Sequence, residues 1–217
     1  MTEESRIYGR RFGGEEKFRQ EMYKILCSKF FQRYVPEDAT VLDVAAGYCE
    51  FINNIRAKKK IALDINPDAK KFAKEDVNVI TSSSSDMRKI DNGSVDVVYV
   101  SNFLEHISRE EIQKTMSEIH RVLRTGGTLL VLQPNIRYCY KDYWMFFDHV
   151  TPIDHRTLAE ILELNGFEII ELRPRFLPYT TKNKLPKSLS MLKLYLRLPI
   201  LHRLFGGQAF AFAKKRL

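Results

Sequence analysis

Two aspartates, Asp43 and Asp64, have the residue type and the spacing to hold a small ligand between two strands. Asp43 lies at the end of the apolar run 40–44, and Asp64 follows the short run 60–63. The small residues 45–47 come directly after the first run and allow a ligand to approach the backbone closely. A strand, a tight turn, a helix and a second strand that ends in an acid are typical of a nucleoside-binding βαβ unit.

The chemistry of this turn selects among the nucleosides. The dinucleotide fingerprint requires three glycines, one of them for contact with a pyrophosphate, whereas this turn has only Gly47. An acid at position 43 repels a pyrophosphate and attracts an ammonium group. S-adenosylmethionine combines a cationic amino-acid end with a neutral adenosine. We expect Asp64 to accept hydrogen bonds from both ribose hydroxyls, because a carboxylate has two acceptor oxygens.

The sequence resembles the class I S-adenosylmethionine-dependent methyltransferases over roughly residues 38–172, in particular the type-11-like group that modifies small molecules and glycans. The first motif of that family, acid-x-Gly-x-Gly-x-Gly, reads Asp43-x-Ala45-x-Gly47-x-Cys49 here, so small residues replace two of its glycines. Three later segments also resemble the family: Ser84–Met87, its adenine-contacting loop; Ser101–His106, its Leu-Glu-His segment; and Arg121–Thr128, its glycine turn before the fifth strand.

The resemblance implies S-adenosylmethionine as cofactor, and S-adenosylhomocysteine as product. The residues expected to contact the cofactor are Asp43, Ala45, Gly47, Tyr48, Cys49, Asp64, Ile65, Ser85, Asp86, Met87, Ser101, Asn102 and Phe103. Asp86 is expected to meet the adenine amino group, and Met87 the adenine ring. Near the N-terminus, Arg11 or its neighbour Arg10 is expected to pair with the cofactor's carboxylate and Tyr8 to close over it; a frayed terminus is the alternative.

The elements that must position these residues follow from the apolar pattern. Strands are expected near 40–44, 60–63, 77–80, 95–100 and 128–133, then at 167–172 and 208–213; helices are expected near 15–34, 48–57, 68–75, 109–123 and 156–165. This is an α/β chain, and the resemblance implies a Rossmann-like seven-stranded, mostly parallel sheet of order 3-2-1-4-5-7-6 with the last strand antiparallel and helices on both faces. We expect one domain, with a helical cap at 1–37, a cofactor-binding core at 38–172 and a basic apolar helical insert at 182–207.

The stretch 137–149 after the fifth strand is expected to be a loop that meets the methyl acceptor. Six of its thirteen residues are aromatic, including the only Trp, and loops are ordinarily polar. These rings either pack beneath other elements or bind an amphipathic acceptor such as a sugar, since Tyr and Trp combine flat apolar faces with polar tips. The absence of Asn-Pro-Pro-Tyr at 101–104 favours, by resemblance, oxygen or carbon acceptors over nitrogen in nucleic acids or proteins.

A hydroxyl acceptor requires a base, and three histidines are candidates. His149 is the first choice, because it follows the aromatic stretch and its neutral form accepts a proton near pH 7, with Asp148 or Asp154 orienting the ring. His106 is the second, next to the expected cofactor site. His155 lies near a helix start and is expected to cap or pack.

The charge is concentrated in the C-terminal part. The net charge of +8 divides into −3 for residues 1–171 and +11 for residues 172–217, which hold 11 Lys and Arg and no acid. Within this part, 182–205 combines leucines at helical spacing with Lys193 and Arg197, while Pro199 must break or restart the helix. Such a helix favours an anionic membrane surface, and the alternative is a lid that buries its leucines on the aromatic stretch.

Several function classes are set aside on composition. The polar N-terminus argues against a signal peptide, the three separated cysteines argue against a disulfide framework or a metal site, and no apolar run is long enough to span a bilayer. We therefore expect a cytoplasmic protein, peripheral at the inner face of the membrane, that O-methylates a small-molecule, sugar or lipid-linked glycan acceptor without a metal. A non-catalytic cofactor-binding module at a membrane and an RNA methyltransferase are the alternatives; nucleic acid is the less favoured partner, because the basic residues alternate with leucines.

Overall fold

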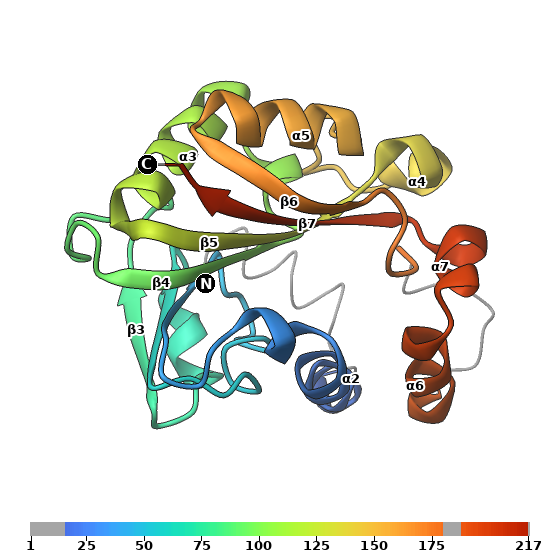
Figure 1. Cartoon of the computed structure of the whole chain (residues 1–217), viewed down its shortest axis with the longest axis horizontal. Coiled ribbons are helices and arrows are strands. Elements are labelled where there is room, and N and C mark those ends of the chain that lie inside the picture. The colour runs from blue at the N-terminus through green and yellow to red at the C-terminus, as the bar shows by residue number, and fades with distance from the viewer. Residues whose placement is uncertain (1–15, 180–187, 217) are drawn as a thin grey trace.

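The computed structural model describes residues 16–179 and 188–216, so Tyr8, Arg10 and Arg11 lie outside the described residues. A seven-stranded sheet of order β3-β2-β1-β4-β5-β7-β6 forms the centre of the described part (Figure 1). The strands are β1 (Thr40–Val44), β2 (Lys59–Asp64), β3 (Val77–Thr81), β4 (Val95–Ser101), β5 (Leu123–Pro134), β6 (Phe167–Arg173) and β7 (Gln208–Lys215). The first five strands are parallel, and β7 is antiparallel to both β5 and β6. The expected strand order is confirmed.

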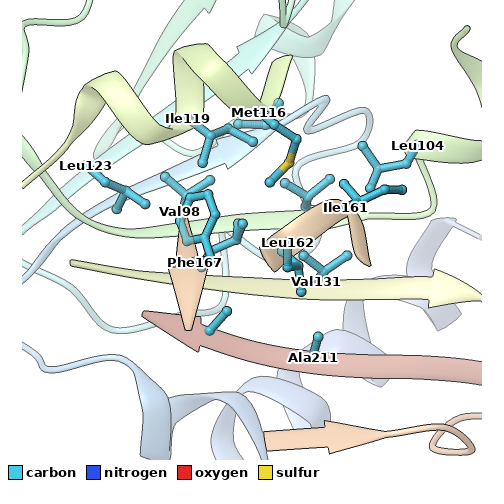
Figure 2. Close-up of a cluster of buried hydrophobic side chains, with 14 of the residues drawn as sticks. Val98, Leu104, Met116, Ile119, Leu123, Val131, Ile161, Leu162, Phe167 and Ala211 are labelled. Atoms are coloured by element: carbon cyan, nitrogen blue, oxygen red, sulfur yellow. The ribbon is translucent and has the colours of Figure 1, made fainter. Parts of the chain in front are cut away.

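Helices cover both faces of this sheet. They are α2 (Glu16–Lys29), α3 (Arg109–Val122), α4 (Ile136–Tyr143), α5 (His155–Leu164), α6 (Leu189–Arg197) and α7 (Pro199–Phe205), with short 3-10 helices η1 (Phe31–Tyr34), η2 (Pro67–Lys71) and η3 (Leu104–His106). Alternate residues of β1 point to opposite faces, so that Leu42 packs in one core cluster and Val41 in the other. Figure 2 shows the first cluster, in which α3 and α5 residues such as Met116 and Leu162 meet the strand residue Val98.

Two predicted helices between the early strands are wrong. The stretch predicted as helix 48–57 forms turns: Cys49 has a positive φ of 56°, the Asn54 side chain donates to the Glu50 carbonyl oxygen, and the Asn53 side chain donates to the distant Phe72 carbonyl oxygen. The predicted helix 68–75 is only the 3-10 helix η2, which begins at Pro67 after the Asn66 cap. It does not continue, since the Lys74 N–H donates to the Asn53 side chain instead.

Two boundaries around β5 also differ from the prediction. Helix α3 ends at Val122 and β5 begins at once, so Gly126 and Gly127 lie inside the strand rather than before it. There the pairing to β4 shifts register, and Gly127 is closely packed: a Cβ atom would lie 2.9 Å from the Arg124 carbonyl oxygen. After β5, the aromatic stretch begins as the helix α4 and not as a loop, with the Asn135 side chain capping it.

The described part of the basic insert, from residue 188 onwards, forms the two helices α6 and α7, separated at Pro199 as predicted. Helix α6 lies beside α2 (Figure 1), and Leu192, Leu196 and Leu201 pack on the second core cluster. The leucines that are covered therefore rest on the α2 side of the molecule and not, as the lid alternative predicted, on the aromatic stretch. Among the described residues, no helix is long and apolar enough to cross a bilayer.

Candidate functional site

The predicted ligand-binding residues gather where the parallel strands end. Val44 pairs with Leu63 on one side and with Val100 on the other, so the ends of β1, β2 and β4 are level. Ligands in open α/β sheets bind at the carboxyl ends of the strands, next to the first strand. Asp43, Asp64 and Ser101 all lie at this edge, as expected.

The turn after β1 has left-handed backbone at three alternate positions, only one of which is glycine. Ala45, Gly47 and Cys49 have φ values of 56°, 52° and 56°, which is the left-handed region that glycine adopts freely. For Ala45 and Cys49 this conformation costs about 1–2 kcal/mol each. The backbone is thus held in the shape of a motif that allows close approach, at the two positions where the family has glycine.

Two buried carboxylates flank this turn. Asp64 accepts the Gly47 N–H at 2.7 Å through one oxygen and the Asn66 N–H at 2.8 Å through the other. Asp43 is only 4% exposed and accepts a backbone hydrogen bond from Ile52. Burial, then the neighbouring Glu50, raises the pKa of Asp43 well above its ordinary value, and burial also raises that of Asp64. A cluster of desolvated acids favours a cationic ligand, as the ammonium end of S-adenosylmethionine provides.

Helix α2 covers the turn, and sequence reasoning missed this role. Arg19 forms an ion pair with Glu50 at 2.6 Å, and the Gln20 side chain donates to the Tyr48 carbonyl oxygen at 3.2 Å. One turn further, the Tyr23 hydroxyl lies 3.5 Å from Ser101 Oγ at the end of β4. The only signal in the sequence was the spacing of Arg19 and Tyr23, four residues apart on one helix face.

The remaining predicted cofactor residues take different positions. Ile65 is exposed at the rim, directly after Asp64, and the Tyr48 ring packs edge-on against Phe72. Asn102 has a positive φ of 47° and donates to Ser101 Oγ, whereas the partly buried Phe103 packs on the first core cluster.

The predicted adenine loop lies less close to this edge. Asp86 forms an ion pair with the exposed Arg88, Ser85 bonds to Ser83, and Met87 is fully buried in the core. Ser82, which precedes the predicted loop, meets the end of β2, where its N–H donates to the Asp64 carbonyl oxygen at 3.1 Å. Position relative to β3 would have indicated Ser82, because it directly follows the strand.

The three proposed catalytic residues are brought together beyond β4. His106 Nδ1 lies 3.2 Å from an Asp148 carboxylate oxygen, and the His106 and His149 rings pack edge-on with centroids 4.8 Å apart. On the other side, His106 Nε2 lies 3.7 Å from the buried Glu105 carboxylate, which accepts a hydrogen bond from Gln133. Asp154 instead caps α5 and pairs with Arg156, and the amide of Asn135 lies 3.1 Å from His155 Nδ1.

Electrostatics distinguish His106 within this cluster. Burial lowers its pKa, but the Asp148 hydrogen bond and the nearby Glu105 charge outweigh burial, so the pKa of His106 is raised above its ordinary value. Burial also raises the pKa of Glu105. The Asp148 carboxylate therefore orients the His106 ring and stabilises its protonated form.

Exposed aromatic side chains border the histidine pair. Tyr143 is buried against His149, but Tyr138, Tyr140, Trp144 and Phe147 are exposed, the last by 96%. The packing alternative therefore holds for Tyr143 and Phe146, which pack against His149, and binding of an acceptor by the exposed rings stays a prediction.

Comparison with known proteins finds similar sequences and structures. Residues 42–131 match the family model "Methyltransferase domain". A S-adenosylmethionine-dependent methyltransferase from Archaeoglobus fulgidus is similar in structure, with 25% sequence identity, a TM-score of 0.68 and coverage of 93% of this chain and 97% of that one. No match was found among curated protein sequences.

Two further solved structures share the fold at lower identity. A putative methyltransferase from Haloferax volcanii, solved with its Trm112 activator, has 16% identity, a TM-score of 0.71 and full coverage of both chains. Geranyl diphosphate C-methyltransferase from Streptomyces coelicolor, solved with S-adenosyl-L-homocysteine, has 14% identity, a TM-score of 0.61 and coverage of 88% of this chain and 78% of that one. At these identities the likeness shows the fold and leaves the methyl acceptor open.

Proposed function

We propose that this chain, which is similar to S-adenosylmethionine-dependent methyltransferases over residues 42–131 and in its fold, methylates a hydroxyl oxygen of a sugar or lipid-linked glycan. The observation that carries the proposal is the histidine–aspartate pair beside an exposed aromatic surface at the cofactor end of the sheet. Aromatic rings with polar edges suit the apolar faces and hydroxyl rims of sugar rings.

In this proposal, different residues bind the cofactor and accept the proton. Bound S-adenosylmethionine supplies an electrophilic methyl group, and the protein supplies alignment and a base. Asp43 holds the ammonium end of the cofactor and Asp64 holds its ribose. The left-handed turn at 45–49 lets the cofactor approach the backbone closely. His106 Nε2 accepts the proton of the acceptor hydroxyl, while Asp148 fixes the ring through Nδ1. The hydrogen bond to Asp148 is the reason to place the base at His106, and the His149 ring packs edge-on against it.

The proposal is tested by following the methyl group. Purified protein is incubated with S-adenosylmethionine labelled in the methyl group and with cell extract separated into glycan, lipid, RNA and protein fractions. We expect base-stable label in the glycan or lipid-linked glycan fraction, because sugar methyl ethers resist alkali and methyl esters do not. Label confined to RNA or protein would refute the acceptor class, and cofactor binding without transfer to any fraction would indicate a non-catalytic module.

Variants then test the base. His106→Gln should reduce the turnover of the identified acceptor by about 100-fold or more, the usual range for general base catalysis, and leave cofactor affinity unchanged. His120→Gln is the matched control, since His120 lies on α3 against Phe167 and away from the cluster. Glu105, His106 and His149 also have atom types that can hold a divalent cation, with these atoms within 4.8 Å of one another. Activity that survives EDTA assigns the histidine to proton transfer, whereas activity restored by added metal would contradict that role.

A further inference from the structure

Helices α6 and α7 present two different faces. Tyr195 and His202 are buried, and Leu192, Leu196 and Leu201 are half-buried against the second core cluster. The opposite face is also apolar: its exposed large side chains are Met191, Leu194, Leu198, Ile200, Leu204 and Phe205. Soluble helices ordinarily expose a polar face, so an exposed run of this kind requires an explanation.

The polar residues on the same face are cationic. Lys193, Arg197 and Arg203 are exposed among the apolar side chains, and residues 172–217 contain no acid. Within 16–179 and 188–216, no ion pair involves these three residues. The face therefore combines apolar area with positive charge that nothing in the described chain neutralises.

This combination separates the candidate partners. A second copy of the same face would bring like charges together, and a nucleic acid would leave six large apolar side chains against phosphates. A surface of anionic phospholipids satisfies both components, since apolar side chains enter the headgroup boundary while cations meet the phosphates. The helices have nine and seven residues, so they fit a position in the plane of the surface and not across it.

We propose that the exposed face of α6 and α7 docks this enzyme on an anionic phospholipid bilayer. The inference rests on the proposed function in one respect, because it gives the means by which a lipid-linked acceptor reaches the active site. Figure 1 places α7 at the same end of the molecule as α4, whose exposed rings form the proposed acceptor surface. Docking through α6 and α7 brings that surface towards the bilayer.

The test measures sedimentation of the full-length protein with vesicles of phosphatidylcholine alone, or of phosphatidylcholine mixed with phosphatidylglycerol. Binding is expected only with the anionic mixture, and it should weaken with salt. Lys193→Glu with Arg197→Glu should weaken binding by about 30-fold or more, because each cation near an anionic leaflet contributes about 1 kcal/mol. Leu194→Glu with Ile200→Glu should abolish binding through the apolar component.

The matched control is Arg109→Glu with Lys114→Glu on α3. This pair changes the net charge by the same amount, at exposed positions of a helix on the other face of the sheet. Equal loss of vesicle binding in the control and in the α6 variant, or no binding by the unaltered protein, would overturn the inference. Salt-sensitive binding to RNA that the same α6 variant abolishes, without vesicle binding, would assign the face to nucleic acid and overturn it also.

The outcome is independent of the acceptor assay. Vesicle binding uses no acceptor, and circular dichroism together with cofactor affinity confirms that each variant is folded. Methylation of a soluble glycan without vesicle binding removes the docking inference and keeps the proposed function. Vesicle binding with methyl transfer only to RNA or protein removes the proposed function and keeps the docking surface.

Discussion

Replacement of Asp43 by Asn should raise the stability of the free protein and weaken its binding of the cofactor. Asp43 is almost fully buried, and its neighbours Glu50 and Asp64 are also acids. In the protein without cofactor, burial and these charges raise its pKa, so the ionised form destabilises the fold at neutral pH. Asn keeps the shape and still accepts the Ile52 N–H, so Asp43→Asn should raise the melting temperature of the free protein.

The effect on binding follows from the lost charge. A hydrogen bond to a charged group contributes about 1.5–3 kcal/mol. The full amount applies to Asp43, because its side chain is buried and little screened by solvent. Asp43→Asn should therefore weaken S-adenosylmethionine about 10- to 150-fold in calorimetry. Because the folded pKa lies above the unfolded one, the unaltered protein loses stability as pH rises from the ordinary carboxyl range through the raised value. The difference in melting temperature should widen over that interval.

Asp96→Asn provides the control for both measurements. Asp96 lies at the other end of the sheet, where it accepts the Thr40 N–H at 2.7 Å and pairs with Arg124. Its replacement should lower stability by about 1 kcal/mol and leave cofactor affinity unchanged. If Asp43→Asn lowered the melting temperature, or bound cofactor as tightly as the unaltered protein, the assignment of Asp43 to the ammonium end would be wrong.

Three further changes have defined outcomes. Ala45→Gly should stabilise the protein by about 0.5–1 kcal/mol in urea unfolding, because relief of the left-handed strain exceeds the added unfolded-state entropy; a loss of stability would contradict the strain. Asp154→Ala should cost about 1–2 kcal/mol at pH 7, since Asp154 accepts two N–H groups at the start of α5. Burial raises the pKa of Asp154, but those bonds and Arg156 outweigh burial and lower it to about 2. The contribution of Asp154 to stability is therefore present above the ordinary carboxyl pKa and is lost as pH falls through 2. An equal loss of stability in the variant at pH 2 would argue against the cap. Asp148→Asn should move the acid limb of kcat/KM to lower pH, because Asp148 raises the pKa of His106, and an unmoved limb would remove His106 as the base.

Local sequence predicted the elements that depend on local patterns. The strand order came from a resemblance anchored at Asp43 and Asp64, and the boundary of α5 from apolar spacing and the Asn165-Gly166 end. The prediction of a helix at 48–57 was wrong, because a buried series of turns can show the same apolar spacing of Phe51, Ile52 and Ile55 as a helix. The positive φ at Cys49 and the side-chain hydrogen bonds of Asn53 and Asn54, which the apolar spacing does not show, accompany these turns.

The same division applies to the site. The sequence by itself indicated the cofactor, because an acid at position 43 and a turn with one glycine suit a cationic nucleoside without a pyrophosphate, and the motifs resemble a family that binds one. Only the tertiary structure decided which side chains meet. Asp148 pairs with His106 across 42 residues, and α2 places Arg19 beside Glu50 across 31. Such pairings depend on how the ends of β4 and β5 and the helices around them pack in space. The local sequence around each residue does not predict that packing.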